Sequence, residues 1–216
     1  MADECQSTTL ILIRHGQARS SDGSYDHETP LSDLGRRQAD AVAVRLASEP
    51  SFAAVYTSPY ARAVQTALPL CDKLGIEPNV DQRLREFELG EMSVPEFVES
   101  RPDLLVWQPD HKGKPDGGTL GEFAARLAGF AGEIAERHLG ERVVIVAHAG
   151  TIDAVIRWAI GLPASSPWQH EVDLANGSIT EIEYWPRGRV PGGAPRYAVL
   201  VRVGDTAHLG EYASDL

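Results

Sequence analysis

Two histidines in this sequence each stand at the end of a run of apolar residues. His15 follows Arg14 and the run at 8–13, and His148 follows the run at 142–147. Runs rich in β-branched residues are typical of strands buried on both faces of a sheet. A neutral imidazole is a competent nucleophile, and an arginine binds phosphate oxygens through a planar fork of donors. Two histidines and an arginine at such strand ends are part of the set that phosphoryl transfer through a phosphohistidine needs.

Two further charged residues complete this chemistry. Arg62 follows the apolar run at 53–57, and Glu86 follows an edge-like strand expected at 76–80. Arginines disfavour protonation of a neighbouring imidazole and hold the charge of a transferring phosphoryl group, so we expect neither a metal ion nor a cofactor. A carboxyl group beside a phosphate has a raised pKa, which suits a general acid for the leaving oxygen. The predicted catalytic residues are His15, Arg14, Arg62, Glu86 and His148.

Strands that alternate with helices must position these residues. Strands are expected at 8–13, 53–57, 76–80, 142–147, 179–185 and 196–203. Helices are expected at 32–47, 58–74, 119–139 and 152–160. This alternation predicts an α/β fold with three layers, in which a mainly parallel central sheet has helices on both faces and ends in an antiparallel pair. Ligands bind beyond the carboxyl ends of parallel strands, so the polar residues that follow the strands should meet at one edge.

Capping residues mark several of the expected helix ends. Ser32 is the expected N-cap of the first helix, and Ser58 followed by a proline is expected to open the second. Gly75 is expected to end that second helix. Thr119 and Glu122 have the spacing of a capping box, which predicts the start of a long helix.

Length and charge limit the domain organisation and the partners. The 216 residues suit one domain, so we predict a single domain over 1–216 with an irregular or helical insertion at about 81–118 that covers the site. The formal net charge of -11 disfavours nucleic acids and anionic membranes as partners because like charges repel. No run approaches the roughly 18 apolar residues that a membrane span requires. A small phosphorylated substrate remains compatible with a local cluster of arginines.

Location and assembly are predicted from weaker signals. The two cysteines, Cys5 and Cys71, are too few for a disulfide framework. The first residues lack the basic and apolar regions of a signal peptide, so we expect a cytoplasmic protein. The apolar end of the sheet near Trp185 could support a homodimer.

Four blocks of the sequence resemble the histidine phosphatase superfamily, the phosphoglycerate-mutase-like family. Residues 12–17 are similar to its Arg-His-Gly signature, and the other matching blocks are 30–39, 56–67 and 144–150. The resemblance implies that His15 carries the phosphoryl group, and that Glu86 is the acid and base. It also implies a phosphate pocket made of Arg14, Arg62, His148 and the backbone amide of Ala149.

The sequence departs from the family pattern at positions that are expected to determine substrate specificity. Gln17 and Ala18 stand where many members have Glu-Thr or Glu-Ser, and Ser21 stands where an asparagine often contacts phosphate. The stretches at 90–94 and 118–120 also differ from the usual residues. The phosphate pocket is therefore expected to be intact, while the leaving-group pocket is specific to this chain. Gln17, Ser21 and Ala149 are the predicted substrate-binding residues.

Several readings stay open at this point. The first is a phosphatase that acts on a small phosphorylated metabolite, and the second is a phosphoglycerate mutase, which the chain length and the absence of tryptophan at position 92 disfavour. A metal hydrolase using His15, His148 and Glu86 is a third, although two arginines would repel a divalent cation. A non-catalytic phosphate-binding module is the fourth. Within the first reading, Glu88 or Glu91 could replace Glu86 as the acid.

Overall fold

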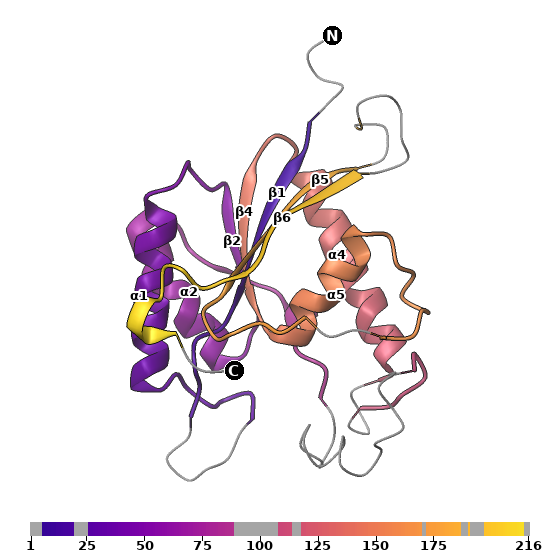
Figure 1. Cartoon of the computed structure of the whole chain (residues 1–216), viewed down its shortest axis with the longest axis horizontal. Coiled ribbons are helices and arrows are strands. Elements are labelled where there is room, and N and C mark those ends of the chain that lie inside the picture. The colour runs from indigo at the N-terminus through magenta and orange to yellow at the C-terminus, as the bar shows by residue number, and fades with distance from the viewer. Residues whose placement is uncertain are drawn as a thin grey trace.

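The computed structural model contains a six-stranded mixed sheet (Figure 1). It describes residues 6–19, 26–88, 108–113, 118–169, 172–186, 190 and 197–213. The strands are β1 (Thr8–Arg14), β2 (Ala54–Thr57), β3 (Asn79–Val80), β4 (Arg142–Ala147), β5 (Ile179–Trp185) and β6 (Tyr197–Asp205). Their order across the sheet is β3-β2-β4-β1-β5-β6. The first four strands are parallel to one another, whereas β5 and β6 are antiparallel additions.

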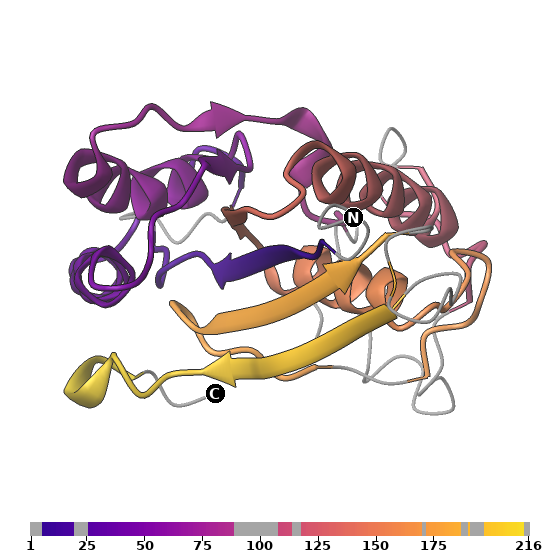
Figure 2. The same ribbon diagram turned by 90° about the horizontal axis from the view of Figure 1, so that it is seen from above.

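Helices cover both faces of this sheet. They are α1 (Asp33–Ala47), α2 (Ala61–Leu74), α4 (Leu120–Arg137) and α5 (Ala149–Ala159). Leu10 and Leu12 of β1 belong to the core beneath α4 and α5, while Ile11 and Ile13 belong to the core beneath α1 and α2 (Figure 2). Because both faces are buried, β1 needs apolar side chains at consecutive positions rather than at alternate ones. The predicted three-layer α/β fold is confirmed.

The predicted caps explain where three helix ends lie. Ser32 accepts a hydrogen bond from the amide of Gly35 at the start of α1. Both halves of the capping box are present at α4, where Thr119 and Glu122 bond reciprocally. Gly75 ends α2 in the left-handed conformation, with φ of 67°. Among the residues that the structure describes, no helix is both long and apolar enough to cross a membrane.

Two predicted helix starts were wrong, and both lie beside the candidate site. The α2 helix begins at Ala61 with Tyr60 as its N-cap, so Ser58 does not cap it. Instead, the Ser58 side chain is hydrogen-bonded to His148. The α5 helix begins at Ala149, three residues earlier than expected, because His148 is itself the N-cap residue.

The segment after β2 differs from its expected form. The strand predicted at 76–80 is reduced to Asn79–Val80, and both of its residues are exposed at the sheet edge. A 3-10 helix, Gln82–Leu84, then leads to Glu86. Of the expected insertion at about 81–118, residues 89–107 and 114–117 lie outside the described residues.

Candidate active site

The ends of two neighbouring parallel strands bring the two histidines together. Arg14 pairs with Ala147 in the register of β1 and β4, so His15 and His148 are the next residues on adjacent strands. Their ring centroids are 5.1 Å apart, with 66° between the ring planes. Both side chains are almost fully buried, at 3% and 1% exposure. The sheet register therefore creates the histidine pair that the sequence predicts.

One nitrogen of the His15 ring faces the backbone of the next residue. Nδ1 lies 2.7 Å from the carbonyl oxygen of Gly16. A carbonyl oxygen only accepts hydrogen bonds, so Nδ1 must carry the proton of the neutral ring and Nε2 must carry the lone pair. Burial and the charge of Arg62 lower the pKa of His15 from 6.5 to about 3. His15 is thus an uncharged base at neutral pH, with Nε2 available for attack on an electrophile.

Arg62 connects the second helix to this imidazole. Its Nε donates to Nε2 of His15 at 3.2 Å, and its Nη1 donates to the carbonyl oxygen of Asp26 at 2.6 Å. The guanidinium also lies over the ring of Tyr60, 4.9 Å from the centroid. The side chain is 4% exposed. Arg14 donates to the carbonyl oxygen of Leu174, and its charge also lowers the pKa of His15.

Glu86 reaches the site through the N-terminus of α5. One carboxylate oxygen accepts from the amide of Phe87 at 2.8 Å, and the other accepts from the amide of Gly150 at 2.9 Å. Burial raises the pKa of Glu86, although these backbone hydrogen bonds and the charge of Arg62 oppose the rise. A raised pKa keeps more of the carboxyl group protonated at a given pH, which suits a general acid.

The comparisons with known proteins agree with this geometry. Residues 10–191 match the family model described as the histidine phosphatase superfamily (branch 1). The chain belongs to this superfamily. It is 30% identical over 212 residues to phosphoserine phosphatase 1 of Hydrogenobacter thermophilus, covering 94% of this chain and 95% of that protein. It is also 27% identical to a probable phosphoglycerate mutase, GpmB, of Yersinia enterocolitica, covering 95% and 97% of the two chains.

A solved structure shows similarity over almost the same length. Mycobacterial glucosyl-3-phosphoglycerate phosphatase in complex with VO3 matches with a TM-score of 0.75 and 25% identity, covering 92% of this chain and 99% of that one. The resemblance of four sequence blocks to the superfamily is therefore confirmed over most of the chain.

Glycines in this histidine phosphatase allow close backbone contacts at the site. A Cβ atom on Gly150 would lie 2.7 Å from Oε1 of Glu86. A Cβ atom on Gly16 would lie 2.5 Å from the carbonyl oxygen of Gly35, and one on Gly35 would lie 2.0 Å from that of Gln17. The backbone leaves no room for a side chain at Gly16 or Gly35, and a side chain at Gly150 would displace the Glu86 carboxylate. Gly150 is thus needed for Glu86 to approach α5, and the other two are needed for the loop after β1 to pack on α1.

We expect Gly150→Ala to reduce kcat by up to about 100-fold while leaving the fold intact. The new methyl group must push the Glu86 carboxylate away, and a displacement of about 1 Å in an active site can cost this much. Gly129→Ala is the matched control, because a Cβ atom there has nothing within 4 Å and the residue lies within α4. Steady-state kinetics and thermal melts of both variants would check this. Wild-type kcat in Gly150→Ala would contradict the assigned contact.

Protonation of the buried His15 ring also makes the stability of the fold depend on pH. The pKa of His15 is lower in the folded state than in the unfolded chain, so the unfolded state binds more protons below about pH 6.5. The stability that depends on a neutral His15 ring is fully present above about pH 6.5 and is lost as the pH falls toward the folded pKa. We expect protonation of His15 to lower the free energy of unfolding by about 1.4 kcal/mol for each unit by which the pH falls in this range. Urea unfolding between pH 7 and 5 should therefore show a shallower decline for His15→Ala than for the wild type, and equal slopes would contradict the neutral ring.

The predicted substrate-binding residues have different positions. The side-chain oxygen of Gln17 accepts a hydrogen bond from the Ser32 hydroxyl at 2.7 Å, which ties it to the start of α1. Ala149 is the first residue of α5, where helix amides have no acceptor inside the helix and favour anions. Ser21 lies outside the described residues.

Four residues near the site had no role assigned from the sequence. Ser58 bonds to His148, and Thr66 accepts from the amide of Gly16 at 3.0 Å. Tyr60 packs against the His148 ring, with centroids 5.0 Å apart, and donates to Glu88 at 2.6 Å. Asn176 donates to the carbonyl oxygen of His15 at 2.9 Å. Ser58 and Thr66 belong to the matching block at 56–67, so that block contained a signal for them.

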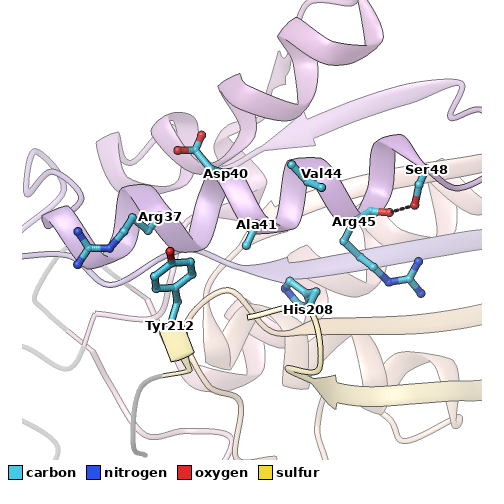
Figure 3. A pocket seen from close by; sticks show the side chains of 8 residues that line it. All are labelled: Arg37, Asp40, Ala41, Val44, Arg45, Ser48, His208 and Tyr212. Atoms are coloured by element: carbon cyan, nitrogen blue, oxygen red, sulfur yellow. Dashed lines mark hydrogen bonds between the residues drawn. The ribbon is translucent and has the colours of Figure 1, made fainter. Parts of the chain in front are cut away.

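A separate groove lies between α1 and the C-terminal segment (Figure 3). Its lining residues are Arg37, Asp40, Ala41, Val44, Arg45, Ser48, His208 and Tyr212. None of them is among the residues around His15. Within the described ranges, no group of three or more His, Cys, Asp and Glu side chains is arranged to hold a metal ion.

Proposed function

We propose that this histidine phosphatase hydrolyses a phosphomonoester of a small metabolite through a phosphohistidine on His15, without a metal ion. The observation that carries the proposal is the state of His15. Its Nδ1 bonds to a carbonyl oxygen, its pKa is far below neutral pH, and its Nε2 faces a guanidinium that binds phosphate well.

In the first step, Nε2 of His15 attacks phosphorus in line with the leaving oxygen. The new N–P bond forms as the P–O bond breaks, and the bonding electrons leave with the oxygen. Glu86 gives its proton to that oxygen, so the leaving group departs as an alcohol. Arg14 and Arg62 hold the charge on the transferring oxygens, which is the largest electrostatic contribution to this type of transition state.

In the second step, water replaces the histidine on phosphorus. The Glu86 carboxylate takes a proton from the attacking water, the new O–P bond forms, and the N–P bond breaks. The electron pair of that bond returns to Nε2, so His15 is again neutral and Glu86 is again protonated. Inorganic phosphate then leaves the pocket.

The test is release of phosphate from a panel of phosphorylated metabolites, before and after treatment with a chelator. We expect turnover of at least one metabolite with kcat unchanged by the chelator. Loss of all activity after chelation would contradict the proposal, because no step of the proposed reaction uses a metal ion. Tight phosphate binding without turnover of any ester would favour the non-catalytic module instead.

A mutase is the second candidate, and the relative named as a probable phosphoglycerate mutase supports it. A mutase and a phosphatase share the phosphohistidine and differ in whether water reaches it. A coupled assay with 2,3-bisphosphoglycerate present separates the two. Interconversion of phosphoglycerates faster than phosphate release would favour the mutase.

We propose that residues 1–216 form one domain in which part of 81–118 makes a wall of the substrate pocket. The described parts of this segment support the idea. A Cβ atom on Gly113 would lie 2.4 Å from the carbonyl oxygen of Glu88, and His111 lies 6.3 Å from Phe87, ring to ring. His111 and Gly113 therefore pack on the residues next to Glu86. A changed substrate preference after exchange of 89–107 would support this role, and an unchanged preference would contradict it.

We propose a homodimer through the edge strand β6. Tyr197 and Val201 are each 53% exposed, and Tyr197 packs against Trp185 with ring centroids 5.5 Å apart. A long apolar edge strand offers unpaired backbone groups to a second strand. Light scattering after size exclusion should give twice the chain mass, and Val201→Lys should halve it. A monomeric wild type would contradict this proposal.

A cytoplasmic location is the last part of the proposal. The buried Cys71 thiol is free, which is compatible with a reducing compartment. Cell fractionation with an antibody to the chain would test it, and recovery outside the cytoplasmic fraction would contradict it.

A further inference from the structure

We infer that the Ser58 hydroxyl is a positioning group that fixes the tautomer of His148, so that the Nδ1–H of this ring is the donor left for a phosphoryl oxygen. The inference rests on the proposed function for its kinetic consequence, but the tautomer itself can be observed without turnover. The Oγ atom of Ser58 lies 2.8 Å from Nε2 of His148. The two residues are 90 positions apart in the sequence.

The direction of this hydrogen bond follows from what surrounds Ser58. The residue has no solvent exposure, and its Oγ already accepts from the amide of Tyr60 at 3.4 Å. Within the described part of the chain, Nε2 of His148 is the one remaining partner of this oxygen. A buried hydroxyl donates wherever an acceptor is in reach, because an unpaired polar group costs free energy. Ser58 therefore donates to Nε2, which must carry the lone pair of the ring.

The other nitrogen of His148 then carries the proton. Burial and the positive charges of the site lower the pKa of His148 well below its usual value, so the ring is neutral and has one N–H. Nδ1 is buried and has no hydrogen-bond partner within the described residues. An incoming phosphoryl oxygen would satisfy this donor, whereas the opposite tautomer would present a lone pair and repel it. The Nδ1–H of His148 is thus placed to donate a hydrogen bond to an anion.

The start of α2 shows that the Ser58 side chain bonds to His148 and does not cap the helix. Serine followed by proline is a strong signal for a helix N-cap, yet the helix begins at Ala61 and its N-cap, Tyr60, makes no side-chain capping bond. The side chain of Ser58 is used for His148 instead. Arg62 follows within the first turn, so one short segment supplies a phosphate-binding guanidinium and the group that orients the second histidine.

Nitrogen-15 NMR of the imidazole rings distinguishes the two tautomers directly. In the wild type at pH 7, we expect Nδ1 of His148 at a protonated shift and Nε2 at an unprotonated shift. In Ser58→Ala, we expect the two shifts to move toward each other as the tautomers mix, and kcat to fall about tenfold with little change in KM, because the lost orientation matters most in the transition state. Ser58→Thr keeps the hydroxyl and should restore both readouts. Ser48→Ala is the matched control, since the Ser48 hydroxyl donates to the carbonyl oxygen of Arg45 on the surface.

Several outcomes would overturn the inference. A wild-type His148 protonated on Nε2 would do so alone, even if Ser58→Ala failed to fold. Unchanged shifts and kcat in a folded Ser58→Ala would do so as well. A wild type that turns over no phosphoester would instead contradict the proposed function, while the tautomer measurement would still decide the role of Ser58.

Discussion

Replacing His15 by alanine should lower kcat for every phosphoester by about 10⁴-fold or more and abolish the phosphoenzyme. Such a loss is expected because the remaining groups act as a unit with the nucleophile and cannot form the covalent intermediate without it. Rapid acid-free quenching with a ³²P-labelled substrate should trap label on the wild-type chain and none on His15→Ala. The trapped bond should be stable to base and labile to acid, as a phosphoramidate is.

The control for this experiment is another histidine of the same chain. His138 bonds to Tyr56 and Glu141 at the opposite end of the sheet, so His138→Ala should keep the wild-type phosphoenzyme. Small imidazoles added to His15→Ala could enter the space left by the ring and restore part of the turnover. Label that persists in His15→Ala would show that another group is the nucleophile.

The elements that carry the site could be predicted because their signals are local. The β4 strand was predicted at its observed bounds, since a continuous apolar run of this length suits a strand with both faces covered. Thr119 and Glu122 marked the start of α4 because a capping box depends only on residues three apart. The rule that parallel strands share one carboxyl edge predicted that His15 and His148 meet at that edge, and the observed pairing of β1 with β4 puts them on adjacent strands.

The errors arose where distant contacts override local preference. Ser58 has the local features of an N-cap, but its hydroxyl is bonded to His148, 90 residues away. Similarly, the glycine at position 150 is explained by Glu86, 64 residues away, because this carboxylate binds the Gly150 amide and a side chain there would displace it. The family resemblance pointed to both the glycine and the carboxylate without giving the reason that links them. The substrate contact expected of Gln17 stays a prediction, and the structure adds that its side-chain oxygen is bonded to the helix cap Ser32.

Replacing Glu86 by glutamine should have the second-largest effect, and the size should depend on the leaving group. For alkyl phosphates, kcat/KM should fall by about 10² to 10⁴-fold, because an alkoxide needs a proton as it leaves. For p-nitrophenyl phosphate the loss in kcat/KM should stay below about tenfold, since nitrophenolate leaves without one. Glu88→Gln is the matched control: the neighbouring carboxylate bonds to the Tyr60 hydroxyl, so its loss should affect both substrates alike and weakly.

The pH dependence tests the same assignment independently. Glu86 must be protonated in the first step, and burial raises its pKa, so kcat/KM for an alkyl phosphate should decrease as the pH rises through that pKa. Glutamine cannot titrate, and this limb should therefore vanish in Glu86→Gln while the activity that remains becomes independent of pH in the same range. A limb that survives in Glu86→Gln and disappears in Glu88→Gln would transfer the acid role to Glu88. Because Glu86 is held by two backbone amides, of Phe87 and Gly150, a shift of this limb in Gly150→Ala would further show that the helix terminus sets the carboxyl pKa.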